Sequence, residues 1–109
     1  MRTLTWFMPV PPLGASQRET YRMDGDYNAV RAWVHCDQAP TIEEVIIDIQ
    51  ADGVSLFSYP LRIQDATDAE EDNFSSAQIS RDTLVSLEIT SRGGNPGSGV
   101  TVGLELEDA

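Results

Sequence analysis

The strongest hydrophobic pattern in the chain lies between Glu43 and Tyr59. Val45, Ile47 and Ile49 alternate with Glu44, Ile46, Asp48 and Gln50, which is the two-residue period of a β-strand. Asp52-Gly53 follows, and this dipeptide favours a tight turn because both residues tolerate positive φ. We therefore predict a hairpin whose return strand runs from Val54 to Tyr59 and ends at Pro60, since proline cannot donate to a strand ladder.

Similar short apolar segments, separated by turn residues, indicate further strands that pair with this hairpin. They lie at Thr3–Met8, Glu19–Met23, Ala29–Cys36, Leu61–Ile63, Phe74–Ile79, Leu84–Ser91 and Val100–Leu106. In the third strand along the chain, the pattern places on one face Val30, Ala32, Val34 and Cys36, and on the other Arg31, Trp33 and His35. Residues 64–73 are expected to form an acidic loop with at most one helical turn near 68–73.

These elements predict an all-β protein, a single antiparallel β-sandwich of about seven to eight strands with jelly-roll-like connectivity. The 109 residues, 1–109, suffice for one hydrophobic core and one domain. No apolar run approaches the roughly 20 residues that span a bilayer. Prolines 9, 11 and 12 break the first apolar segment, so we expect no secretory signal.

The charge narrows the range of partners. Eighteen acidic residues face seven basic residues, all arginine, which gives a net charge of −11. This balance disfavours nucleic acid, because phosphate contacts need clustered Lys or Arg, and it disfavours anionic membranes. We therefore expect neither nucleic acid nor a membrane as partner.

The residues that could carry catalysis have simpler structural explanations. Asp48 and Asp52 could form an acid–base pair, but Asp52 belongs to the predicted turn and Asp48 to a strand face. Cys36 is the only cysteine and lies in an apolar strand pattern, which indicates a buried thiol. His35 is the only histidine, and a strand-face hydrogen bond explains it better than a zinc site. We expect no enzymatic activity and no catalytic residue.

The acidic segment is the only candidate for a bound ion. It carries five carboxylates, at Asp65, Asp68, Glu70, Glu71 and Asp72. Calcium binds clustered carboxylates on loops, so a calcium site within residues 65–72 is conceivable. The spacing does not match an EF-hand, however, and a solvated acidic loop explains the segment more simply, so we expect no cofactor and no metal.

Large apolar side chains on both faces of some strands suggest burial on two sides. Trp6 is followed by Phe7, Ile46 lies between two inward positions, and Trp33 shares a mixed face with Arg31 and His35. A small sandwich has only one core, so the second face would be covered by another molecule. The predicted interface residues are Trp6, Phe7, Trp33 and Ile46.

Four segments carry a resemblance to a known class of proteins. They are IDIQADGVSLF (47–57), LRI (61–63) with Phe74, RDTLVSL (81–87) and GSGVTVGLEL (97–106). This series of hairpin, short strand and closing strand resembles small β-sandwich virion structural proteins of tailed phages, of the capsid-decoration and tail-fibre type. The chain departs from their pattern at Arg81-Asp82, where glycine-aspartate is common, and in its long acidic segment.

The resemblance implies a non-enzymatic capsid decoration protein, synthesised in the host cytoplasm and located on the outer surface of the virion. Its implied partners are further copies of the chain, in a homotrimer, and the lattice of a major capsid protein. Strong negative charge suits an outer surface better than a surface facing DNA. Two alternatives remain open: a tail-associated or tail-fibre subunit, and a carbohydrate-binding (receptor-binding) β-sandwich module.

Overall fold

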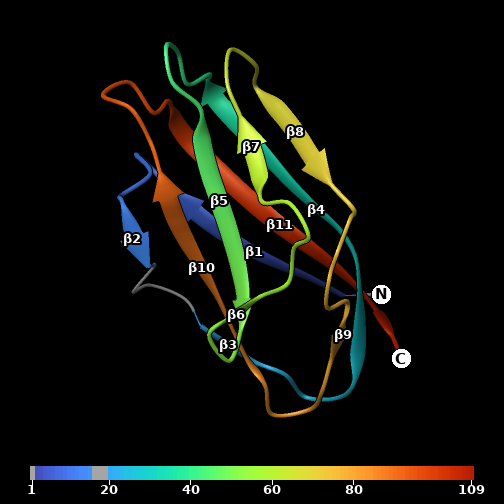
Figure 1. Cartoon of the computed structure of the whole chain (residues 1–109). Helices are drawn as coiled ribbons and strands as arrows, with labels where there is room; N and C mark the ends of the chain where they lie inside the picture. Colours follow the sequence, from blue (N-terminus) through green and yellow to red (C-terminus); the bar gives the residue numbers. More distant parts are fainter. Residues whose placement is uncertain (1, 16–19) are drawn as a thin grey trace.

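A computed structural model describes residues 2–15 and 20–109, which form two antiparallel β-sheets packed face to face (Figure 1). The strands are β1 (Arg2–Met8), β2 (Gly14–Ala15), β3 (Tyr21–Arg22), β4 (Tyr27–Gln38), β5 (Val45–Ala51), β6 (Val54–Ser55), β7 (Leu61–Ile63), β8 (Asp68–Glu71), β9 (Gln78–Ile79), β10 (Leu84–Ser91) and β11 (Ser98–Asp108). The described residues contain no helix, and therefore none long and apolar enough to cross a membrane.

The strand order defines the two sheets. Sheet A has the order β1-β11-β4-β8, and β9 also pairs with β4. Sheet B has the order β2-β10-β5-β6, while β3 pairs with β10 and β7 pairs with β5. The prediction of an all-β sandwich is confirmed. The predicted hairpin organises only sheet B, because the long strands β1, β4 and β11 form the other sheet.

The core lies between the sheets and is built from alternate residues of the long strands. In β11 the inward residues are Val100, Val102, Leu104 and Leu106, and in β10 they are Val85, Leu87 and Ile89. No polar or charged residue among those described is buried. The period-two pattern in the sequence therefore identified the inward face of these strands, because one side of each sheet excludes water and the other does not.

The return strand of the central hairpin is shorter than predicted. It consists of β6 alone, and the chain then leaves the sheet so that Phe57 forms a bridge with Phe74. The two rings stack with their centroids 5.4 Å apart. Leu56 and Phe57 are both buried, and consecutive residues of a regular strand cannot both face the core. The strand ladder resumes at β7, which pairs with the first half of β5.

A bulge corrects the predicted inner face of β4. Glu105 pairs with Arg31 and Leu106 with Ala29, so the register skips Val30. The extra residue turns Val30 outward, where it is 36% exposed, and turns Ala29 into the core. The sequence of one strand cannot reveal this shift, because a bulge is an extra residue relative to the partner strand.

The segment predicted as an acidic loop contains an edge strand. Residues Asp68–Glu71 form β8, which pairs with Ala32–His35 of β4, so the predicted helical turn near residues 68–73 is wrong. The predicted strand at 74–79 is reduced to β9. Of the predicted strand at 19–23, Tyr21–Arg22 form β3 and Glu19 lies outside the described residues. Edge strands can be polar on both sides, so hydrophobic alternation does not detect them.

Candidate functional site

The outer face of sheet A brings together most of the side chains singled out from the sequence. Strand pairing places Thr5, Gly103, Trp33 and Glu70 in one row across four strands. The adjacent row contains Phe7, Thr101, His35 and Asp68. An exposed face with aromatic and charged residues is therefore built from β1, β11, β4 and β8.

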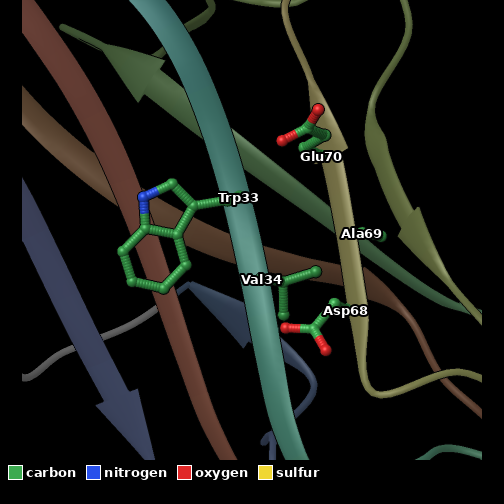
Figure 2. Close-up of a pocket in the computed structure, with 5 residues that line it drawn as sticks. All are labelled: Trp33, Val34, Asp68, Ala69 and Glu70. Carbon is green, nitrogen blue, oxygen red and sulfur yellow. The ribbon is translucent and has the colours of Figure 1, made fainter.

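Trp33 lies across the backbone of β11. A Cβ atom added to Gly103 would lie 2.2 Å from Cε2 and 2.3 Å from Cζ2 of the indole, so the ring occupies the place of a side chain. Gly103 is buried even though it belongs to the outer face, because the indole covers it. Figure 2 shows the ring extending from β4 away from β8. One side of the indole thus packs on the strand, while Trp33 as a whole is only half-buried.

An open pocket of about 390 Å³ lies where β4 and β8 pair. It is lined by Trp33, Val34, Asp68, Ala69 and Glu70. Asp68 and Glu70 extend from β8 toward β4 (Figure 2). Their side chains are 69% and 63% exposed, so both carboxylates are in contact with water.

An arginine ties three strands of this face together. Arg31 donates from Nε and Nη2 to Oε2 of Glu105, at 2.9 and 2.6 Å, and from Nη1 to Oε2 of Glu70 at 3.1 Å. The hydrogen bond to Glu105 is the main reason that the pKa of Arg31 is raised. Arg31 therefore stays charged and orients a carboxylate on each of the strands that flank β4.

His35 forms a second link between β4 and β8. Its Nδ1 lies 2.8 Å from Oδ1 of Asp68, and its Nε2 lies 3.7 Å from Oδ1 of Asp37. The hydrogen bond to Asp68 is the main reason that the pKa of His35 is raised above 6.5, and desolvation of the ring opposes it. The same bond lowers the pKa of Asp68. Both groups are therefore charged over a wider pH range than they would be without this bond.

We expect replacement of Asp68 by asparagine to lower the pKa of His35 toward 6.5. Asp37→Asn should lower it less, because Asp37 acts only through a weaker charge interaction. Since His35 is the only histidine, a single imidazole signal in an NMR titration reports the value. A raised pKa means that any stability from this bond is present below pH 6.5 and is lost as the pH rises through the folded pKa. An unchanged titration in Asp68→Asn would contradict the assignment.

The four predicted interface residues are not gathered on one surface. Trp6 is 2% exposed and belongs to the core, so it is not available to a partner in this structure. Phe7 is 55% exposed on the outer face of sheet A. Trp33 lies on that face two strands away, and Ile46 is half-buried in β5 of sheet B.

The residues weighed for catalysis have structural partners. Asp48 accepts hydrogen bonds from Ser55 and from Gln50. Asp52 adopts a φ of 50° in the hairpin turn and accepts a hydrogen bond from the Leu84 backbone N–H at 3.0 Å. Cys36 is 1% exposed, and burial raises the pKa of its thiol. The hydrogen bonds of the two aspartates and the burial of the thiol give each of these residues a structural role in the fold.

The carboxylates of the acidic segment are divided by the geometry of β8. Asp68 and Glu70 lie on the outer face, whereas Glu71 points to the other side and accepts hydrogen bonds from the backbone N–H groups of Asp72 and Asn73. Within residues 2–15 and 20–109, no three His, Cys, Asp or Glu side chains are grouped to hold a metal ion.

A second exposed feature lies where β1 leaves sheet A for β2 of sheet B. Phe7, Val10 and Leu13 are 55%, 54% and 64% exposed, and we call these three residues the apolar corner. The backbone there is held by a hydrogen bond from the Gly99 N–H to the Pro9 carbonyl at 2.9 Å. The sequence has no charged residue between Arg2 and Arg18, although the whole chain carries a charge of −11. The apolar corner therefore lies within the longest uncharged part of the N-terminal half.

Comparison of the chain with protein-family models, with curated proteins and with solved structures gives no match. The outer face of sheet A and the apolar corner are therefore the two candidate functional surfaces. The sequence singled out Trp33 and Phe7 as interface residues and Glu70 only as one of the acidic residues considered for calcium, and it gave no role to Gly103. A glycine in the middle of the clean alternation of 100–106 was the available signal, because a strand glycine often marks the close approach of another group.

Proposed function

We propose that the chain is a non-enzymatic virion structural protein, a capsid decoration protein that oligomerises on the outer lattice of a phage head. The observation that carries this proposal is the apolar corner. Three apolar side chains within seven residues are each more than half exposed, and exposed apolar residues that are grouped mark interaction surfaces more often than isolated ones. Such a surface gains stability when another molecule covers it.

The distribution of charge favours a second copy of the chain as the molecule that covers the apolar corner. Two copies with a charge of −11 repel one another over most of their surfaces. Residues 3–15 carry no charged side chain, so contact through them brings no charge of their own to the interface. The resemblance to trimeric virion proteins, given by the 47–57 and 97–106 segments, suggests three copies. The acidic remainder suits an exterior position better than one beside DNA.

We further propose that the sandwich is a jelly roll. If β2 with β3, β6 with β7, and β8 with β9 are each counted as one element, the chain has eight elements in sequence. In this count the first element pairs with the eighth, the second with the seventh, the third with the sixth, and the fourth with the fifth. Such nested pairing is what a long antiparallel hairpin gives when it wraps into two sheets. It supports jelly-roll connectivity and is compatible with a virion subunit.

We expect Phe7→Asp and Leu13→Asp to weaken self-association about tenfold or more, equivalent to about 1.4 kcal/mol each. Each substitution places a negative charge and removes an apolar contact within the apolar corner. Light scattering over a range of concentrations measures the shift toward the monomer. Val54→Asp is the matched control, because Val54 is 66% exposed and the substitution adds the same charge outside the apolar corner.

Equal weakening by all three substitutions would show that net charge, and not the apolar corner, governs association. Docking on the capsid is a separate question, which co-sedimentation of the protein with empty phage heads addresses. Binding to heads without self-association would retain the decoration function and overturn the trimer. Failure to bind heads would favour the tail-associated alternative.

A further inference from the structure

We propose that the outer face of sheet A is a binding site for a neutral saccharide, in which a pyranose ring stacks on the indole of Trp33 and its hydroxyl groups hydrogen-bond to Glu70 and Asp68. This site goes beyond a role in assembly, and it uses a surface distinct from the apolar corner apart from the edge at Phe7. It would be compatible with a position on either the head or the tail.

The stacking surface is formed by the indole of Trp33 and the backbone of β11. Because the indole takes the place of a side chain at Gly103, it lies over the strand and does not stand out from it. Its neighbours in the row are Thr5 beyond Gly103 and Glu70 on the other side, so no second large side chain from that row competes for the place. A large apolar ring surrounded by polar groups suits the C–H face of a sugar ring, with polar partners for its hydroxyl groups.

The hydrogen-bonding groups lie on β8, across β4 from the indole (Figure 2). Asp68 and Glu70 line the open pocket together with Trp33. Oε2 of Glu70 accepts a hydrogen bond from Arg31. Oε1 of Glu70 accepts none from the residues that the structure describes. Both oxygens of Asp68 are already in use, by His35 and Thr67, but a carboxylate oxygen can accept more than one hydrogen bond. Acceptors of this kind suit sugar hydroxyl groups.

Hydrogen bonds within the protein restrain both carboxylates in the absence of a ligand. Arg31 holds Glu70, and His35 with Thr67 holds Asp68, so three residues restrict the two acceptors. A ligand then loses less binding energy to the ordering of side chains. Such preorganisation matters for saccharides, because each hydroxyl group must give up its water partners on binding.

The charge of the face selects the class of saccharide. This face and its margin carry four carboxylates, from Asp37, Asp68, Glu70 and Glu105. Among the described residues the cationic side chains paired with them are Arg31 and His35. An acidic sugar such as a uronic or sialic acid would meet net repulsion. Neutral hexopyranose chains fit this environment. The source could be a cell-surface glycan or a free polysaccharide, since both present the same rings.

The site can be tested by NMR, using the indole Nε1–H signal of Trp33 as the probe. Trp6 is the only other tryptophan in the sequence. It is 2% exposed, so a ligand at the surface should not shift its indole signal directly. We would titrate the full chain separately with cellohexaose, maltohexaose, mannohexaose and chitohexaose. We expect at least one to shift the Trp33 signal with a dissociation constant of about 1 mM or lower. Polygalacturonate oligomers should give at least about tenfold weaker binding, equivalent to about 1.4 kcal/mol.

Two variants separate the site from general surface effects. Trp33→Ala removes the ring, whereas Gly103→Val keeps the ring but gives residue 103 a side chain in the space that the ring occupies. Each should weaken binding about tenfold or more, as followed by the shifts of backbone amide signals in β4 and β8. Tyr59→Ala is the control, because Tyr59 is an aromatic residue that is 66% exposed and lies outside this face. It should bind like the unmodified protein.

Two results would overturn the saccharide site. One is the absence of any shift with all four neutral hexaoses. The other is binding that persists in both Trp33→Ala and Gly103→Val. A Trp33 signal that changes with protein concentration but not with sugar would assign the face to contact between copies of the chain and would also reject the site. The same titrations in Leu13→Asp keep this outcome separate from any change in self-association.

Discussion

Replacement of Trp6 by alanine is expected to lower the free energy of unfolding by about 3–5 kcal/mol. Trp6 is 2% exposed, and its ring meets Tyr21 edge-on with the centroids 5.4 Å apart. The substitution would leave a cavity between the sheets next to β1, the edge strand of sheet A. A loss of this size is a large part of the roughly 5–15 kcal/mol that stabilises a typical small domain.

Urea denaturation followed by circular dichroism measures this difference. Phe7→Ala is the matched control, because Phe7 is the next residue of the same strand and is 55% exposed. It should change the stability of the monomer by less than about 1 kcal/mol. If the two substitutions had equal effects, Trp6 would not be the core residue that the structure describes. Trp6→Phe provides a milder variant should the alanine variant fail to fold.

Substitution of Gly97 by alanine is expected to destabilise the fold by about 1–3 kcal/mol. Gly97 has a φ of 82°, a backbone conformation that residues with a Cβ atom adopt at a cost. An added Cβ atom would also lie 2.5 Å from the backbone oxygen of Gln38 and 3.0 Å from the nitrogen of Pro40. Neither neighbour is a flexible side chain, so the connection into β11 would have to move.

Thermal unfolding compares this variant with Gly94→Ala, the control in the same glycine-rich connection. A Cβ atom at Gly94 would meet no atom within 4 Å, and its φ is not positive. Gly94→Ala should therefore leave the stability unchanged or slightly raise it, because alanine restricts the unfolded chain. A larger loss in Gly94→Ala than in Gly97→Ala would contradict the described geometry.

The long strands could be predicted from the sequence because each has one face in the core and one in water. The predicted bounds Leu84–Ser91 are those of β10, and the prediction at 100–106 falls within β11. The alternation of Val100 to Leu106 reflects burial directly. Sheet membership could not be predicted in this way, because alternation reports which residues are buried and not which strands pair.

The polar and irregular parts of the fold lacked such a signal. β8 reads DAEE and is held by backbone hydrogen bonds to β4, which any residue except proline can make. The outward position of Val30 depends on a bulge relative to β11. In both cases the partner strand determines the structure, and the local sequence does not contain that information.

The candidate saccharide site was accessible to sequence reasoning only in part. The mixed face of Arg31, Trp33 and His35 followed from alternation and is the face that the structure places outside the core, with His35 and Trp33 beside β8. Its partners come from residues about 35 and 70 positions further along the chain, such as Glu70 and Gly103. Strand order was needed to bring them together.

The mass of the unmodified protein in solution at neutral pH is the measurement that tests the proposed assembly role most directly. Multi-angle light scattering should give three times the 12.0 kDa of one chain as the concentration rises, with the apolar corner covered in the trimer. The mass of a single chain at every concentration that solubility permits would contradict self-association through this corner.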